Sequence, residues 1–357
     1  MSRFPSLRQV ANDARFAAGV LRQRPFQVLI QVTNRCNMQC SFCDFWPHPA
    51  PRSQELTVAE YRRVADELSD LGCFLVSIEG GEPLVRPDLV EIVQVLSQRH
   101  VPTLFTNGWF VTEPKAQALF AAGLPHACVS IDYADAGRHD RKRGVPGATE
   151  RAWRAVELLR RAAPQGGKQV HVMTVVMGDN QSELPALLAQ SAAAGVGHQI
   201  TLLSTGGYRR GGRTPESPGL PQVTGSPAPA DSLPAPGIGA ELHTLWQRYP
   251  HARFFRDYAL GIDTFLSGGA LPDCHAGEQS FNIDHVGNVS PCIEKIDRSV
   301  GNIRSSGLAE LLEKLRLAQA GAGCQACWTA CRGFAQAMGA GGTRRAWQDM
   351  SGRMRSW

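Results

Sequence analysis

The sequence predicts an α/β fold with a parallel β-sheet, followed by a smaller cysteine-rich unit. Between residues 27 and about 204, short apolar runs alternate with helical patterns, as expected of β-then-α units whose strands run parallel. After residue 270 the chain becomes rich in cysteine and turn residues. Six such units fit a curled sheet or partial barrel as well as an open doubly wound sheet, and periodicity does not choose between them.

Six apolar runs are the predicted strands, and the segments between them carry helix signals. Thr57 and Glu60 form a capping box, and Pro87 opens the next helical pattern. Gly123 and Gly195 are expected to end two later helices. The predicted strands are residues 27–33, 73–79, 101–106, 126–132, 170–176 and 199–204.

Residues 1–25 predict an amphipathic helix with arginines beside its apolar face. We expect this helix to dock on the main domain, with a membrane surface as the alternative. The apolar face comprises Leu7, Val10, Ala11, Ala14, Ala17, Ala18 and Leu21, and the arginines are Arg8, Arg15 and Arg22.

The remaining boundaries follow from composition. The main domain is expected to span residues 26–204. Residues 205–238 are dominated by Gly, Pro and Ser and predict a linker or lid. A helical connection at 239–269 leads to the cysteine-rich unit at 270–335 and a basic tail at 336–357.

Composition excludes several classes of protein. No run of 18 apolar residues exists, and the N-terminus lacks the apolar centre of a secretory signal, so a cytoplasmic location is expected. The net charge of +5 comes from scattered arginines, which does not indicate nucleic-acid binding. Eight of the ten cysteines are clustered at metal-ligand spacing, which in a cytoplasmic chain indicates metal or catalysis rather than disulfides.

The first cluster is Cys36, Cys40 and Cys43, in the stretch CNMQCSFC. Structural zinc sites need four ligands and usually begin with a C-x2-C pair, and no fourth ligand stands at such spacing. Three thiolates on one loop instead suggest a cubane iron–sulfur cluster with one iron open to another ligand.

This stretch resembles the signature of the radical S-adenosylmethionine (SAM) superfamily, C-x3-C-x-aromatic-C, with Phe42 as the aromatic residue. The flanking segments resemble the family too: GGEP at 80–83, TNG at 106–108, VSID at 129–132 and HDRKRG at 139–144. The resemblance implies a partial (β/α)6 barrel with SAM and its [4Fe-4S] cluster at the carboxyl ends of the strands.

The resemblance also implies roles for individual residues. Cys36, Cys40 and Cys43 would hold the cluster whose open iron chelates SAM, and reductive cleavage of SAM would yield a 5′-deoxyadenosyl radical that abstracts hydrogen from the substrate. The implied SAM contacts are Gly80, Gly81 and Glu82 with the ammonium group, Ser130 and Arg143 with the ribose and carboxylate, and Phe42 near the adenine. Pro83 and Asn107 complete this set, and Asp132 is the candidate proton acceptor.

The second cluster resembles the SPASM and twitch extensions that carry auxiliary iron–sulfur clusters. A hairpin with Gly287 at its turn is expected between the first two of its cysteines. Five cysteines can complete one cubane but not two, so we expect one auxiliary [4Fe-4S] cluster; a four-cysteine zinc site is the alternative. The expected ligands are Cys274, Cys292, Cys324 and Cys327. Cys331 is spare, replaces one of them or contacts a second, incomplete cluster.

Three hypotheses for function remain open at the level of sequence. The preferred hypothesis is a radical SAM enzyme acting on a small molecule, such as a lipid or sugar. The alternative is an enzyme that modifies a peptide or protein, as in the maturation of ribosomally made peptides. From another class comes an iron–sulfur or zinc-binding regulator without turnover. Both enzyme hypotheses imply an electron donor such as flavodoxin or ferredoxin.

Overall fold

A nine-stranded, largely parallel sheet organises the chain in the computed structural model, which describes residues 6–47, 49–204, 232–318, 323–339, 344, 346 and 348–349. The strand order is β6-β5-β4-β3-β2-β1-β7-β8-β9. The first six strands pair in parallel with their sequence neighbours, which is the predicted core. They are β1 (Gln27–Thr33), β2 (Leu75–Gly80), β3 (Val101–Thr106), β4 (His126–Ser130), β5 (Val170–Val176) and β6 (Gly197–Leu202).

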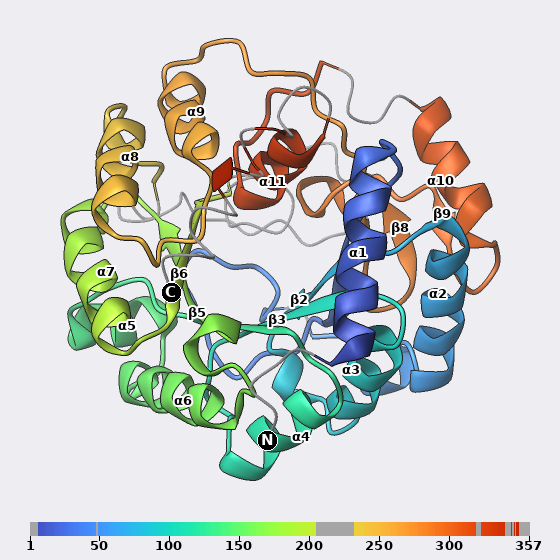
Figure 1. Ribbon diagram of the computed structural model, residues 1–357, viewed down its shortest axis with the longest axis horizontal. Coiled ribbons are helices and arrows are strands. Elements are labelled where there is room, and N and C mark those ends of the chain that lie inside the picture. The colour runs from blue at the N-terminus through green and yellow to red at the C-terminus, as the bar shows by residue number, and fades with distance from the viewer. Residues whose placement is uncertain are drawn as a thin grey trace.

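Helices surround this sheet and bury its outer face (Figure 1). The capping box at Thr57 and Glu60 forms as predicted at the start of α2, and Gly123 and Gly195 follow α4 and α7 with positive φ. The helices between strands are α2 (Val58–Leu71), α3 (Leu89–Ser97), α4 (Glu113–Ala121), α5 (Ala136–Arg143), α6 (Ala148–Ala162) and α7 (Leu184–Ala193).

Three predicted strands, β1, β3 and β5, begin and end at the predicted residues. β4 is shorter than predicted and ends at Ser130. Two residues later, the Asp132 side chain accepts hydrogen bonds from Val175 N of β5 and from Arg143. All parallel strands present their carboxyl ends at one edge of the sheet. The cysteine loop and the segments after β2, β3 and β4 therefore meet at that edge.

The cysteine-rich unit continues the main sheet. The hairpin forms from β7 (Ser280–Ile283) and β8 (Asn288–Ser290), with Gly287 at φ +93° in its turn as predicted. β7 pairs in parallel with β1, and the short β9 (Gly301–Asn302) pairs with β8.

Four more helices follow: α8 (Ile238–Arg248), α9 (Arg256–Leu266), α10 (Leu308–Leu317) and α11 (Ala330–Met338). Figure 1 shows α8, α9 and α10 on the outside of the molecule and α11 nearer its middle. The backbone N–H of Ala330 at the start of α11 donates to Thr201 in β6, 3.0 Å away. The unit thus contacts both β1 and β6, the two outer strands of the six-stranded core.

The N-terminal helix α1 (Leu7–Leu21) docks on the domain, but not through its apolar face. The buried Asn12 amide donates to the backbone oxygens of Ser97 and His100, both at 3.1 Å. Phe16 packs edge-on against Phe26, and Val20 is fully buried. The expected docking of this helix on the domain is confirmed, and these contacts leave its apolar face turned outward.

No described helix is long and apolar enough to cross a membrane. Most of the expected lid at 205–238 and of the expected tail at 336–357 lies outside the described residues.

Candidate active site

The three cysteines of the first cluster lie on the loop that leaves β1 at the carboxyl edge of the sheet. Cys40 is buried, and Cys36 and Cys43 are partly buried, in an apolar cluster with Met38, Phe42 and neighbouring side chains. Burial raises the pKa of Cys36 to about 12 and that of Cys40 to about 11. Such thiols keep their protons at neutral pH unless a metal displaces them. The donor set of three soft ligands on one loop fits an iron–sulfur cluster.

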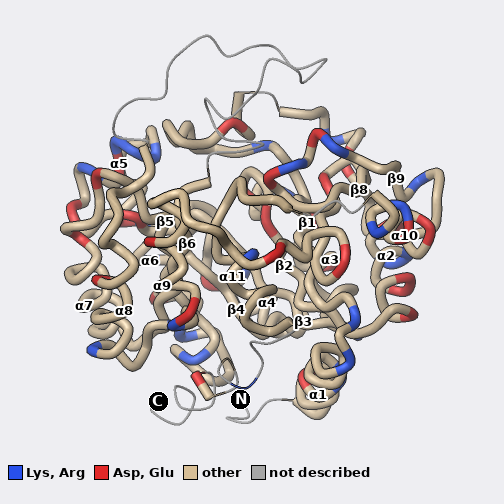
Figure 2. The backbone as a smooth tube through the Cα atoms, turned by 90° about the horizontal axis from the view of Figure 1, so that it is seen from above, with Lys and Arg blue, Asp and Glu red and all other residues tan. Residues whose placement is uncertain are grey.

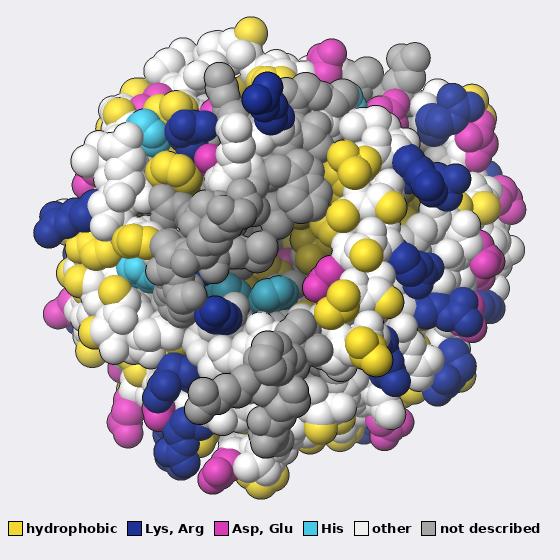
Figure 3. All heavy atoms as spheres, in the orientation of Figure 1, with side chains coloured by type: hydrophobic (Ala, Val, Ile, Leu, Met, Phe, Trp, Pro, Cys, Tyr) yellow, Lys and Arg dark blue, Asp and Glu magenta, His cyan; other side chains and the backbone are white. Residues whose placement is uncertain are grey.

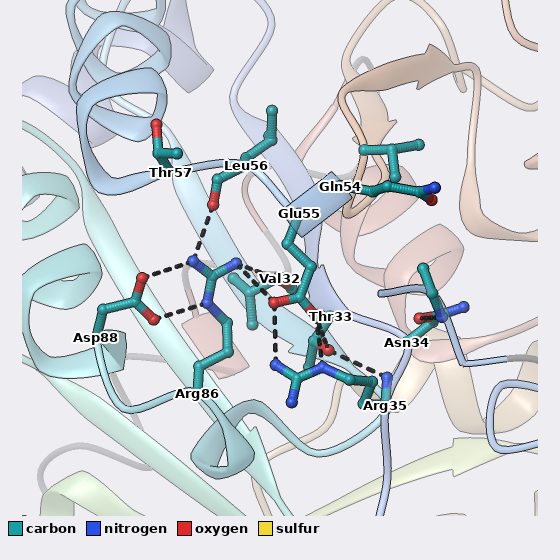
Figure 4. Close-up of polar contacts among 12 residues, drawn as sticks. Val32, Thr33, Asn34, Arg35, Gln54, Glu55, Leu56, Thr57, Arg86 and Asp88 are labelled. Carbon is teal, nitrogen blue, oxygen red and sulfur yellow. Dashed lines mark hydrogen bonds and ion pairs between the residues drawn. The ribbon is translucent and has the colours of Figure 1, made fainter. Parts of the chain in front are cut away.

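The start of this loop is held by a buried carboxylate (Figure 4). Glu55 is 3% exposed and accepts two hydrogen bonds from the Arg35 guanidinium, at 2.9 and 3.0 Å. The Thr33 hydroxyl at the end of β1 donates to the same carboxylate. Because Arg35 immediately precedes Cys36, this contact sets the direction in which the loop leaves the strand.

A second arginine ties β1 to the segment before α2. The Arg86 guanidinium donates to the backbone oxygens of Val32 and Leu56, each at 2.8 Å, and pairs with Asp88 at 2.8 Å (Figure 4). It also lies 3.6 Å from Glu55. Neither Glu55 nor Arg86 was among the predicted site residues, because nothing in their local sequence indicates that they meet.

The Gly80-Gly81 pair packs directly against the cysteine loop. Gly81 N donates to Thr33 O at 2.8 Å, and Glu82 N donates to Arg35 O at 2.9 Å. A Cβ atom would lie 2.1 Å from Thr33 O at Gly80 and 2.2 Å from Arg35 O at Gly81. The family resemblance implies that these glycines contact the ammonium group of SAM, for which close backbone approach is one reason. The structure gives a second reason, which is close approach of the loop backbone itself.

The Glu82 carboxylate is turned into the protein and fully buried. It accepts hydrogen bonds from Leu84 N at 3.0 Å, the Thr106 hydroxyl at 2.7 Å and Asn107 N at 2.7 Å. Burial raises its pKa. These contacts join the turn after β2 to the turn after β3, so the side chain predicted to meet the SAM ammonium already has three protein donors. The buried Pro83 begins the short helical turn that Glu82 caps.

Asn107 reaches from β3 to the cysteine loop. Its amide donates to Asn37 Oδ1 at 2.9 Å and lies 3.9 Å from Cys36 Sγ. Ser130 is partly buried at the end of β4. Both predicted residues therefore lie at the same edge of the sheet as the cysteines.

Arg143, at the end of α5, is the buried cation of the site. Its Nη2 pairs with Asp132 at 2.6 Å, Nη1 lies 3.9 Å from Cys40 Sγ, and its guanidinium carbon lies 5.5 Å from the centre of the Phe42 ring. Within the described part of the chain its buried Nε has no hydrogen-bond partner. One donor of a buried arginine is thus available for an anionic group.

Asp132 is fully buried, and both of its carboxylate oxygens are occupied. One accepts from Arg143, and the other accepts from Val175 N at 2.9 Å. These contacts suit a residue that positions Arg143. The assignment of Asp132 as proton acceptor stays a prediction.

The five cysteines of the C-terminal unit line a single cavity together with Leu29 of β1, Glu294, Lys295 and Arg332. Burial raises the pKa of Cys327 to about 12 and raises that of Cys292 and Cys331 further. The pKa of Cys324 is lowered, since the N–H of Ala326 and the charge of Lys295 outweigh its desolvation. Five soft donors around one cavity fit one four-iron cluster.

Aromatic packing holds this cysteine loop against the barrel. The buried Trp328, between Cys327 and Cys331, stacks on Tyr258 of α9 and donates to its backbone oxygen at 2.8 Å. The Tyr258 hydroxyl accepts from Leu202 N at the end of β6. Gly261 and Gly333 leave room for these rings, because a Cβ would lie 2.4 Å from Trp328 or 2.2 Å from Tyr258. No motif in the sequence indicates this contact.

Two family models match the chain. The one described as the radical SAM superfamily matches residues 30–190, and SPASM, described as an iron–sulfur cluster-binding domain, matches residues 274–332. Both matches contain the clustered cysteines of their region.

Curated relatives and solved structures agree with these matches. The mycofactocin maturase MftC of Mycolicibacterium smegmatis is 31% identical over 327 residues, covering 87% of this chain and 77% of the relative. The AdoMet-dependent heme synthase of Nitratidesulfovibrio vulgaris is 27% identical over 298 residues, covering 80% and 77%. Streptococcus suis SuiB, in a crystal structure bound to its precursor peptide SuiA, shares the fold with a TM-score of 0.61 at 15% identity, covering 85% of this chain and 69% of that one. The chain therefore belongs to the radical SAM superfamily, as an enzyme with a C-terminal SPASM-type domain whose cofactors are SAM and [4Fe-4S] clusters.

Proposed function

We propose that Cys36, Cys40 and Cys43 hold the cluster that binds SAM, and that the enzyme acts on a peptide substrate. The site assignment rests on the contacts of the cysteine loop with the segments at the carboxyl ends of the neighbouring strands. Gly81 and Asn107 bind it from β2 and β3, while the backbone oxygens of Lys142 and Arg143 accept from Ser41 N at 3.2 Å and from Gln39 N at 3.1 Å. When bound, the reduced cluster and SAM supply a 5′-deoxyadenosyl radical that abstracts hydrogen from an unactivated carbon.

The residues around the loop bind and orient SAM in this proposal. Arg143 offers its Nε to the SAM carboxylate, and Asp132 neutralises and fixes the arginine. The backbone oxygens of Gly80 and Gly81 face the ammonium group, while Glu82 fixes the turn that carries them. Phe42 lies near the adenine and Ser130 near the ribose. Burial of the loop in an apolar cluster excludes water from the site.

In the C-terminal unit we assign one auxiliary [4Fe-4S] cluster to Cys274, Cys292, Cys324 and Cys327. Cys331 is the cysteine that would take the place of one of these four if that one is not a ligand. These four thiolates would hold the cluster, and the chemistry that it would supply there is electron transfer. A one-electron donor such as flavodoxin or ferredoxin would reduce the SAM-binding cluster.

The comparisons support a peptide over the small molecule that the sequence argument placed first. MftC is named a maturase, and SuiB was crystallised with a precursor peptide. The second candidate is a small macrocyclic substrate, since a heme synthase aligns over 80% of this chain. A regulator without turnover is not supported, because the named relatives are enzymes.

The test is anaerobic purification with metal analysis, followed by incubation with SAM and dithionite. About eight irons per chain and release of 5′-deoxyadenosine are expected. The matched variant is Cys36→Ala/Cys40→Ala/Cys43→Ala, which should release no nucleoside yet keep the absorbance of the auxiliary cluster. Nucleoside release by this triple variant would refute the site.

The substrate class is tested with the same holoenzyme. Peptides encoded beside the gene and a porphyrin are added separately in deuterated buffer, and each is analysed by mass spectrometry. A modified peptide supports the proposal. Modification of the porphyrin alone would favour the second candidate.

A further inference from the structure

The outward face of α1 is an apolar stripe. Leu7 is 91% exposed, Val10 49% and Leu21 66%, and the smaller Ala11 and Ala14 beside them are exposed as well. At 100° per residue these side chains fall on one side of the helix. Figure 3 shows the resulting row of hydrophobic side chains at the position that α1 occupies in Figure 1.

A row of arginines borders this stripe. Arg8, Arg15 and Arg22 are spaced seven residues apart, so they share one flank of the helix, and all three are exposed. Within the described part of the chain none of their side chains makes a hydrogen bond or an ion pair, and the first turn holds no acidic residue. The one carboxylate of the helix, Asp13, lies on the opposite flank. Figure 3 shows basic side chains along one side of the hydrophobic row.

The docked face of the helix is separate from both features. Asn12, Phe16 and Val20 attach α1 to the domain from the side away from the stripe. The stripe is therefore held rigidly and faces outward, and the helix needs no refolding to use it.

We propose that this face of α1 attaches the protein peripherally to an anionic lipid surface, with the stripe in the interface and the arginines on phosphate groups. Exposed leucines bordered by arginines complement such a surface in both hydrophobicity and charge. A second copy of the chain fits less well. A 15-residue helix is about 22 Å long and about 10 Å wide, so a paired stripe would bury on the order of 450 Å². Stable interfaces bury at least about 1,200 Å².

The attachment would leave the active site accessible. The helix binds Ser97, the last residue of α3, and His100, which immediately precedes β3, so it lies at the amino edge of the sheet. The cysteine loop and Arg143 lie at the carboxyl edge. Figure 2 shows α1 at one end of the molecule and α5, which carries Arg143, at the other.

The test is co-sedimentation of the anaerobically purified holoenzyme with phosphatidylglycerol–phosphatidylcholine vesicles and with pure phosphatidylcholine vesicles. Binding to the anionic vesicles that weakens with added salt is expected. Arg8→Gln/Arg15→Gln/Arg22→Gln should weaken it by about fivefold per arginine, or on the order of 100-fold together. Leu7→Ser/Leu21→Ser should weaken it by roughly tenfold or more.

The controls are Leu317→Ser, at a leucine of α10 with 68% exposure, and Arg154→Gln, at an exposed arginine of α6. Both should bind like the unaltered protein, and all variants should retain their iron content. Equal binding by the α1 variants and the controls would overturn the proposal. So would the absence of vesicle binding together with a dimer that Leu7→Ser/Leu21→Ser dissociates, because the stripe would then be covered by a second copy.

Discussion

Replacing Glu55 with glutamine, a side chain of the same size, should release the start of the cysteine loop from its contact with this carboxylate. In the unaltered protein the Arg35 guanidinium donates two hydrogen bonds to Glu55, at 2.9 and 3.0 Å. Glutamine can still accept from Thr33, but its NH₂ group then faces the guanidinium and cannot accept from it. Breaking a buried ion pair typically destabilises by about 3–5 kcal/mol. The Arg35 side chain is 27% exposed and can turn to solvent, and Arg86 keeps Asp88 at 2.8 Å, so we expect at most the lower end, about 3 kcal/mol.

The assay combines iron and sulfide analysis, electron paramagnetic resonance of the reduced protein, and urea unfolding under anaerobic conditions. Glu55→Gln should lose the signal of the SAM-binding cluster, about four of about eight irons, and keep that of the auxiliary cluster. The matched control is Glu60→Gln, whose carboxylate pairs with Arg304 at the surface, where such pairs contribute less than about 1 kcal/mol. Glutamine also preserves the capping box there. Full iron content and unchanged unfolding in Glu55→Gln would refute the reasoning.

Three further predictions concern single residues. Gly81→Ala should lose SAM-dependent nucleoside release because its Cβ would lie 2.2 Å from Arg35 O, whereas Gly19→Ala, with open space around it, should be neutral; equal activity would contradict this. Arg143→Lys should weaken SAM binding by roughly 10- to 100-fold in calorimetry, the loss typical of a charged hydrogen bond; unchanged affinity would remove Arg143 from the site. Burial lowers the pKa of His100 to about 4, against about 6.5 in the unfolded chain. The neutral imidazole therefore adds about 3 kcal/mol to the free energy of unfolding above pH 6.5, and this contribution is lost as the pH falls towards 4. His100→Gln should reduce the slope of urea stability across this pH range, while buried His126, His139 and His198, whose pKa values are also lowered, keep part of it; an unchanged slope would contradict the assignment.

The C-terminal unit shows which structural features residue patterns predict and which they do not. The spacing of its cysteines and the turn at Gly287 were visible in the chain, and the hairpin forms there. The pairing of β7 with β1 and the stacking of Trp328 on Tyr258 were not. Strand pairing and ring stacking join residues far apart in sequence, and no local periodicity records which partner will be met.

The N-terminal helix and Glu82 show the same limit for side chains. The helix and its apolar face were predicted from their spacing, yet the Asn12 amide, through two hydrogen bonds to Ser97 and His100, decides which side docks. Glu82 was predicted in a SAM-binding segment, yet its carboxylate accepts hydrogen bonds from the Thr106 hydroxyl and from Asn107 N. A single buried polar contact outweighs a periodic pattern, because leaving such a group unpaired is costly.

The sequence by itself determined the α/β class, the presence of six parallel strands along the chain and the two groups of cysteines. Local periodicity, turn residues and ligand spacing are properties of neighbouring residues, so they can be read without a structure. Only the tertiary structure decided that Glu55 and Arg86 meet beneath the cysteine loop, that Asp132 holds Arg143, and that the apolar stripe of α1 faces outward. These contacts depend on where the barrel brings distant segments together, and that placement is a property of the whole packed chain.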